Sequence, residues 1–223
     1  MNEKILLSFF SVELQTTFNY NARYSKLGKI TSQTKTVWFV LHGYGQLAPY
    51  FIRKFNLLNE IGHCVIAPEG LNRFYKHGFS GRVGACWMTK EDRERDIENY
   101  LSYLNAVYGL EIPRKPTFQI NLLGFSQGAA TASRWITQSH CHFDRLILWA
   151  GIFPPDLNLQ VSRIQLSKSK VALVYGLKDP FISNEILIEQ QSLAEELQAS
   201  PEIHTFDGAH DIDSDTLRKI ADR

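Results

Sequence analysis

Short apolar runs typical of β-strands alternate with amphipathic segments along most of this sequence of 223 residues. The alternation predicts an α/β fold with a mostly parallel central sheet and helices on both of its faces. The length suits one large domain and leaves too little chain for a second of that kind, so we expect residues 1–223 to form a single domain. The expected strands lie at residues 37–41, 64–67, 118–123, 146–149, 171–175 and 203–206.

Amphipathic segments fill most of the gaps between these strands. The clearest lies at about residues 90–108, where apolar side chains form one stripe at helical spacing. Thr89 and Asp92 stand at the spacing of a capping box near its start. Residues 5–30 alternate polar and apolar in places without a convincing helix, so we expect antiparallel strands at one edge of the sheet. Further helices are expected at about residues 48–60, 127–138, 184–198 and 214–222.

The run Gly124-Phe125-Ser126-Gln127-Gly128 lies between an expected strand and an expected helix. A strand that turns into a helix within so few residues places the central serine on a strained corner, with its hydroxyl exposed. Glycine at both ends allows the strand and the helix to approach closely. The pattern predicts that Ser126 is a nucleophile, and a Gly/Ser turn without chemistry is the alternative.

Two further residues with suitable chemistry follow expected strands. Asp179 lies in the turn after one of them, and His210 lies in the loop after the next. The carboxyl ends of parallel strands share one rim of the sheet, where open α/β folds bind ligands. Serine, acid and histidine also follow one another in the chain order that this type of serine turn predicts. We therefore expect a catalytic triad of Ser126, Asp179 and His210, with Asp156 as the alternative acid.

The loop His42-Gly43-Tyr44-Gly45 follows the first central strand. Its glycines let the backbone fold so that an N–H group can point at a developing oxyanion, and we assign this donor to Tyr44. The second donor would be the backbone N–H of Gln127, at the start of a helix whose dipole favours negative charge. His42 itself is expected to hold the loop in shape.

Residues 70–89 form the longest expected irregular connection. Because this loop follows a central strand at the catalytic rim, we expect Phe79, Trp87 and Met88 to supply an apolar wall of the substrate pocket. The alternative is that these side chains pack into the core. The connection of residues 151–170 is short and leaves no room for a cap domain, so the site is expected to be shallow and open.

Composition excludes several classes of protein. A formal net charge of +1 gives no reason to expect binding to nucleic acid or to an anionic membrane. The three cysteines have no zinc-site spacing, and we expect no metal site and a reducing compartment. The apolar run near the start is too short for a signal peptide, and no stretch is long enough for a membrane span. A cytoplasmic protein is expected.

Four stretches of the chain carry a family resemblance: Leu41-His42-Gly43-Tyr44-Gly45, Gly124-Phe125-Ser126-Gln127-Gly128, Gly176-x-x-Asp179-Pro180 and Gly208-Ala209-His210. Together they resemble the α/β-hydrolase superfamily, and within it the phospholipase/carboxylesterase group that includes acyl-protein thioesterases. The resemblance implies the roles assigned above to Ser126, Asp179 and His210, and it implies no cofactor. The thioesterases usually read His-Gly-Leu-Gly-Asp at the first loop, where this chain has Tyr44 and Gln46, so the acyl-chain contacts are expected to differ.

The expected reaction is hydrolysis of a carboxylic ester. His210 would take the proton of Ser126 as the serine oxygen attacks the acyl carbonyl, and water would later hydrolyse the acyl-enzyme. Short- to medium-chain acyl esters, lysophospholipids and thioesters are the candidate small-molecule substrates. A peptidase, an acyltransferase and a non-catalytic binding protein on the same fold are the alternatives. The oligomeric state stays open, a homodimer included.

Overall fold

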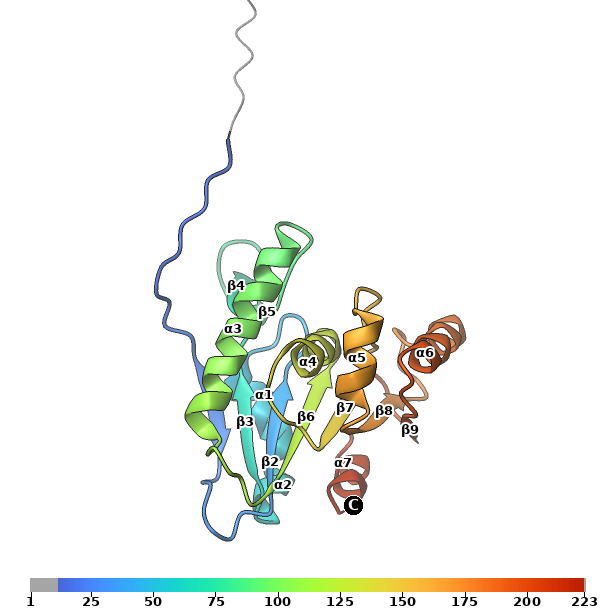
Figure 1. The fold of residues 1–223 in the computed structure, drawn as a ribbon. Helices are drawn as coiled ribbons and strands as arrows, with labels where there is room; N and C mark the ends of the chain where they lie inside the picture. Colours follow the sequence, from blue (N-terminus) through green and yellow to red (C-terminus); the bar gives the residue numbers. More distant parts are fainter. Residues whose placement is uncertain (1–11, 223) are drawn as a thin grey trace, which may run out of the picture.

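The computed structural model describes residues 12–222, and within them a seven-stranded sheet has the order β1-β3-β2-β6-β7-β8-β9 (Figure 1). β1 runs antiparallel to β3, and every other neighbouring pair is parallel. The predicted mostly parallel sheet is therefore confirmed. Its strands are β1 (Tyr24–Leu27), β2 (Thr36–Leu41), β3 (Cys64–Pro68), β6 (Gln119–Phe125), β7 (Arg145–Trp149), β8 (Lys170–Gly176) and β9 (Glu202–Phe206).

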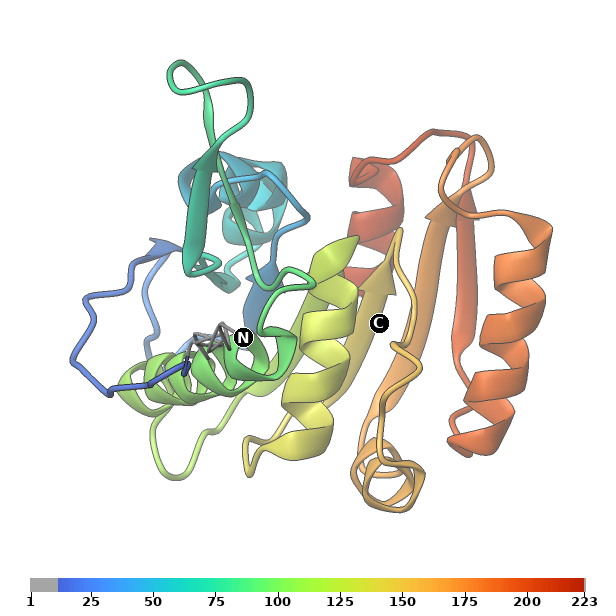
Figure 2. The same cartoon turned by 90° about the horizontal axis from the view of Figure 1, so that it is seen from above.

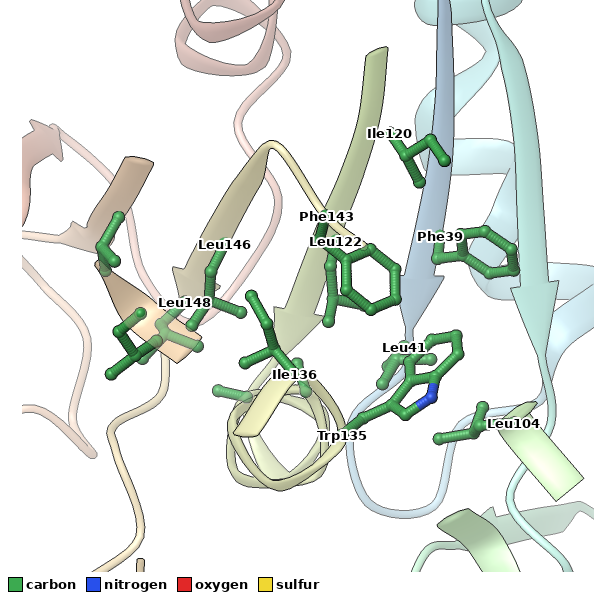
Figure 3. Close-up of a cluster of buried hydrophobic side chains, with 14 of the residues drawn as sticks. Phe39, Leu41, Leu104, Ile120, Leu122, Trp135, Ile136, Phe143, Leu146 and Leu148 are labelled. Atoms are coloured by element: carbon green, nitrogen blue, oxygen red, sulfur yellow. The ribbon is translucent and has the colours of Figure 1, made fainter. Parts of the chain in front are cut away.

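One face of the sheet packs against four helices. Phe39 of β2, Leu122 of β6 and Trp135 of α4 belong to the same buried cluster (Figure 3). The rings of Phe39 and Trp135 meet edge to face, with centroids 5.3 Å apart. Burying each such side chain contributes about 1.5–3 kcal/mol, so this layer supplies much of the stability. The helices are α3 (Arg93–Glu111), α4 (Gln127–Gln138), α5 (Leu159–Leu166) and α6 (Asn184–Glu196).

The opposite face is covered by shorter helices. Trp38 and Val40 of β2 point to this side, because successive side chains of a strand alternate between faces. They pack in a second cluster with Phe51, Phe55 and Leu217. Helices on both faces explain why β2 reads as an unbroken apolar run, with all six of its residues buried. The elements on this side are α1 (Ala48–Phe51), the 3₁₀ helix η1 (Ile52–Phe55), α2 (Asn56–Glu60) and α7 (Ser214–Ala221).

The N-terminal edge matches the expectation only in part. Within residues 12–30 a single strand forms, β1, and Tyr24 lies opposite Pro68 of β3. β3 ends at Pro68, so residues 12–23 have no neighbouring strand with which to pair. The rest of the expected region, residues 5–11, lies outside the described residues.

The connection between β3 and α3 is more regular than predicted. β4 (Asn72–Tyr75) and β5 (Val83–Cys86) form an antiparallel hairpin, so the expectation of an irregular loop over residues 70–89 is wrong. The hairpin lies beside α1 and η1, with which it lines a common cavity (Figure 2). Gly84 allows it to press against the loop after β2, because a methyl group at Gly84 would lie 2.6 Å from the carbonyl oxygen of Gly45.

Two helix boundaries also differ from the sequence expectations. α3 begins at Arg93, and Asp92 precedes it in a left-handed conformation (φ 44°) without a side-chain capping bond. The predicted capping box is therefore wrong, and Asp96 of the first turn instead accepts the backbone N–H of Thr89 at 3.0 Å. α5 was not expected, and its first turn is capped by Asn158, whose side chain accepts the backbone N–H of Val161. It is the one helix between β7 and β8, in agreement with the expected lack of a cap domain.

None of the helices within residues 12–222 is both long enough and apolar enough to cross a membrane.

Candidate active site

Ser126 stands alone between the last residue of β6 and the first residue of α4. Its backbone adopts φ 54° and ψ −119°, a conformation that costs a non-glycine residue free energy and persists only where the surroundings enforce it. Methyl groups at Gly124 and Gly128 would lie 2.2 Å from the Gly128 carbonyl oxygen and 2.3 Å from that of Leu41. The two glycines therefore let β6, α4 and β2 meet closely enough to hold the serine on this corner.

Asp179 and His210 lie on the loops after β8 and β9, and the structure brings them together. Nδ1 of His210 lies 2.7 Å from Oδ2 of Asp179. The Asp179 side chain is fully buried, and its other oxygen accepts the backbone N–H of Phe181 at 2.9 Å. Because a carboxylate only accepts hydrogen bonds, the imidazole donates from Nδ1, which leaves Nε2 to accept a proton.

Two aromatic rings flank the His210 ring. The centroid of Phe125 lies 4.9 Å from that of His210, and the centroid of Phe181 lies 4.8 Å from it. Since Phe125 directly precedes Ser126, the imidazole is held beside the serine turn. Phe181 was missed in the sequence, where its only signal is an aromatic residue two positions after Asp179.

The loop after β2 packs directly on the serine. A methyl group at Gly43 would lie 3.1 Å from Cβ of Ser126, so only glycine fits there without a shift. Oε1 of Gln46 accepts the Gly43 N–H at 2.9 Å, and the Gly45 N–H donates to Ala85 of β5 at 2.8 Å. The loop of residues 42–46, called the oxyanion loop below after the role expected of it, is thus fixed by its own glutamine and by the hairpin.

Tyr44 follows Gly43 and Gln127 follows Ser126 in the chain, and the backbone N–H groups of both are the expected oxyanion donors. Within residues 12–222, neither N–H donates a hydrogen bond to another protein group. Tyr44 is 61% exposed, and its ring lies on that of Phe74, with centroids 5.0 Å apart. Its side chain therefore points to the surface and the hairpin, while its backbone belongs to the oxyanion loop.

His42 is fully buried beneath the oxyanion loop. Its Nε2 accepts the backbone N–H of Gly70 at 2.9 Å, so Nδ1 carries the hydrogen and donates to the Gly43 carbonyl at 2.8 Å. Burial lowers the pKa of His42, although the bond to Gly43 and the charge of Glu69 act in the opposite direction. The ring stays neutral and holds the loop, as its sequence position suggested.

The three residues expected to line the pocket lie in different places. Phe79 lies in the turn of the β4–β5 hairpin and is 97% exposed, so the structure does not bring it together with the other two. Trp87 is buried in the core, and its indole N–H donates to the His42 carbonyl at 2.8 Å. The Met88 carbonyl accepts Nε2 of Gln127 at 3.0 Å. Trp87 and Met88 thus position the oxyanion loop and Gln127.

Asp156, the alternative acid, is engaged elsewhere. Both of its oxygens accept bonds from the buried guanidinium of Arg134, at 2.7 and 3.1 Å, and Arg93 adds a third at 2.7 Å. Burial opposes the ionisation of Asp156, but these hydrogen bonds outweigh it and lower its pKa to about 2. His210 is bonded to Asp179 instead.

Comparisons with known proteins cover most of the chain. A sequence model described as Phospholipase/Carboxylesterase matches residues 27–223, whereas no curated protein matches the chain. Esterase PE8 is similar with a TM-score of 0.68 and 18% identity, over 91% of this chain and 97% of that one. The Bacillus cereus carboxylesterase has a TM-score of 0.66 and 17% identity, over 92% of this chain and 93% of that one. Acyl-protein thioesterase 2 of Zea mays has a TM-score of 0.62 and 14% identity, over 91% of this chain and 97% of that one. At these identities the similarity to the solved structures establishes a shared fold.

Proposed function

Because this chain of α/β-hydrolase fold belongs to the phospholipase/carboxylesterase family, we propose that it is a serine hydrolase that cleaves carboxylic esters through an acyl-enzyme. Family membership supports an ester-hydrolysing enzyme. The observation that carries the assignment to particular residues is the 2.7 Å bond between His210 and the buried Asp179, on a ring that packs beside the residue preceding Ser126.

In the proposed mechanism, His210 acts as the general base. Its Nε2 takes the proton of the Ser126 hydroxyl as the serine oxygen attacks the acyl carbonyl. Asp179 holds the ring with Nδ1–H toward itself and stabilises the imidazolium that forms. His210 then gives its proton to the leaving alcohol or thiol, and a water activated by the same nitrogen hydrolyses the acyl-enzyme.

The oxyanion hole would consist of the backbone N–H groups of Tyr44 and Gln127. The α4 helix starts at Gln127 and is 12 residues long, so its dipole favours negative charge at that N–H. Each such donor typically lowers the barrier by about 3 kcal/mol. Hydrogen bonds fix the oxyanion loop before substrate arrives, and little reorganisation is needed during the reaction.

The surroundings of Ser126 favour small or single-chain acyl esters. The one helix between β7 and β8 is eight residues long, so no cap encloses the rim from that connection. Phe181 beside His210 is 65% exposed and offers an apolar surface at the rim. We assign short- to medium-chain acyl esters, lysophospholipids or thioesters as the substrate class.

Hydrolysis of 4-nitrophenyl esters from acetyl to palmitoyl tests the function. We expect wild-type turnover and a loss of at least about a thousandfold in Ser126→Ala. Ser192→Ala, an exposed serine on α6, is the matched control and should retain activity. A fluorophosphonate should add to Ser126, as shown by peptide mass. Full activity in Ser126→Ala would overturn the proposal.

A further inference from the structure

A cavity of about 680 Å³ opens between the oxyanion loop, α1 with η1, and the β4–β5 hairpin. Its wall includes Gly45 and Gln46 of the loop and the buried ring of Phe51. We call it the basic pocket, because the charged residues that line it within residues 12–222 are all basic: Lys54, Lys76 and Arg82. The hairpin and the short helices that contribute to it lie side by side in the view from above (Figure 2).

The cations of the basic pocket are largely without counter-charges. Within residues 12–222, neither Lys76 nor Arg82 forms an ion pair. Lys54 pairs with Asp211 at 2.6 Å, but the Asp211 side chain is 61% exposed, so water screens that pair. Like charges gathered at a cavity without acids repel one another, and an anion relieves this repulsion.

The basic pocket adjoins the proposed catalytic residues. The Lys76 ammonium lies 3.7 Å from the point where a Gly45 methyl group would stand, directly after Tyr44 in the chain. Phe51 packs on Phe125, the neighbour of Ser126, with ring centroids 5.9 Å apart. Gln46 lines the pocket and also holds Gly43 against the serine. The basic pocket is therefore lined by residues that contact the loop and the aromatic ring next to Ser126.

We propose that the basic pocket binds an anionic group, a carboxylate or a phosphate, on the ester substrate. The inference rests on the proposed esterase function and narrows its substrate class to anionic esters. Arg82 offers a planar fork that suits both groups, and the lysines add point charges. The apolar ring of Phe51 fits the carbon chain that would join the anionic group to the ester.

Paired substrates test this specificity. Mono-4-nitrophenyl adipate carries a carboxylate on the acyl side, and its neutral partner is 4-nitrophenyl methyl adipate. 4-Acetoxybenzoate carries the charge on the leaving group, with methyl 4-acetoxybenzoate as its partner. The quantity measured is the ratio of kcat/KM between anionic and neutral esters. The variant is Lys76→Gln/Arg82→Gln, and the control of equal charge change is Lys168→Gln/Arg114→Gln, which removes exposed cations at the opposite ends of the strands.

In the wild type we expect kcat/KM to be about tenfold higher for the anionic ester than for its neutral partner in at least one pair. Two partly screened charge contacts supply a preference of this size. The pair that shows it tells which side of the ester enters the basic pocket. The ratio should fall to about one in Lys76→Gln/Arg82→Gln and persist in the control. A ratio of one or less in the wild type, or a ratio that the double variant leaves intact, overturns the inference while the esterase function stands.

Direct binding separates this inference from the proposed function. Calorimetric titration of the wild type with adipate, and separately with inorganic phosphate, should show binding that Lys76→Gln/Arg82→Gln loses. If no ester is hydrolysed, the esterase proposal fails, and this binding alone supports an anion site. An absence of binding and of any anionic preference overturns the site.

Discussion

Gln127 accepts a hydrogen bond of 3.0 Å at its side-chain Oε1 from the backbone N–H of Trp87, and its Nε2 donates to the next carbonyl, that of Met88. The first residue of α4 is thereby tied to the segment after β5. Because that segment also bonds to His42, the two proposed oxyanion donors share one support.

We predict that Gln127→Leu lowers kcat/KM by about tenfold, although the substituted residue keeps its backbone N–H. The variant loses both bonds to residues 87 and 88, so the proposed donor is less well positioned for the oxyanion. Ester hydrolysis and circular dichroism measure the effect. Gln138→Leu, at the exposed far end of the same helix, is the control. Unchanged kcat/KM in Gln127→Leu contradicts this role of the side chain.

Gly43→Ala should reduce kcat/KM by about a hundredfold, because the new methyl group displaces the oxyanion loop from the serine. It would lie 3.0 Å from Cδ1 of Phe125 and 3.1 Å from Cβ of Ser126. The kinetic constants on a short-chain ester measure this loss.

Gly109→Ala is the matched glycine control. Gly109 lies in α3, and a methyl group there meets nothing within 4 Å. Removing a helix glycine should stabilise the protein by about 0.5–1 kcal/mol and leave hydrolysis unchanged. Equal activities of the two alanine variants would show that the loop tolerates displacement.

Residues placed by strand ends were the most predictable part of the site. Asp179 and His210 could be predicted to share a rim because each follows an apolar run of a parallel strand, and the structure joins them by a hydrogen bond. Phe181 and Gln46 could not be assigned in this way. Their contacts with His210 and Gly43 depend on how loops fold in space, which apolar periodicity does not report.

The missed elements have a similar explanation. β4 and β5 are four residues long and flank a turn rich in glycine and charge, so each gives too short an alternation to stand out. The expected capping box over Thr89 and Asp92 failed because the carboxylate of Asp96 satisfied the Thr89 N–H. Several side chains can accept the same backbone N–H, and sequence spacing alone does not reveal which of them does so in the folded protein.

The two candidate acids should separate by activity. Asp179→Asn is expected to lower kcat by about 10³–10⁴-fold, because an amide favours the wrong tautomer of His210 and cannot stabilise its cation. Asp156→Asn should stay within about twofold of the wild type, since its carboxylate bonds to Arg134 and Arg93. Steady-state kinetics on one ester decide between them. A large loss of kcat in Asp156→Asn with none in Asp179→Asn would make Asp156, and not Asp179, the acid of the triad.

Asp156→Asn should instead lower the free energy of unfolding, by about 2 kcal/mol near pH 7, because it leaves the Arg134 guanidinium without its counter-charge. The Arg134 side chain is 3% exposed, whereas that of Asp156 is 30% exposed, which moderates the loss. The pKa of Asp156 falls from 3.8 to about 2 in the folded protein, so its contribution is complete above 3.8 and is lost as pH falls through about 2. Urea unfolding of both proteins should therefore show a gap that is constant from neutral pH down to about pH 5 and narrows at about pH 3. A difference in unfolding free energy that is as large at about pH 3 as at neutral pH would mean that the ionised carboxylate is not what stabilises Arg134.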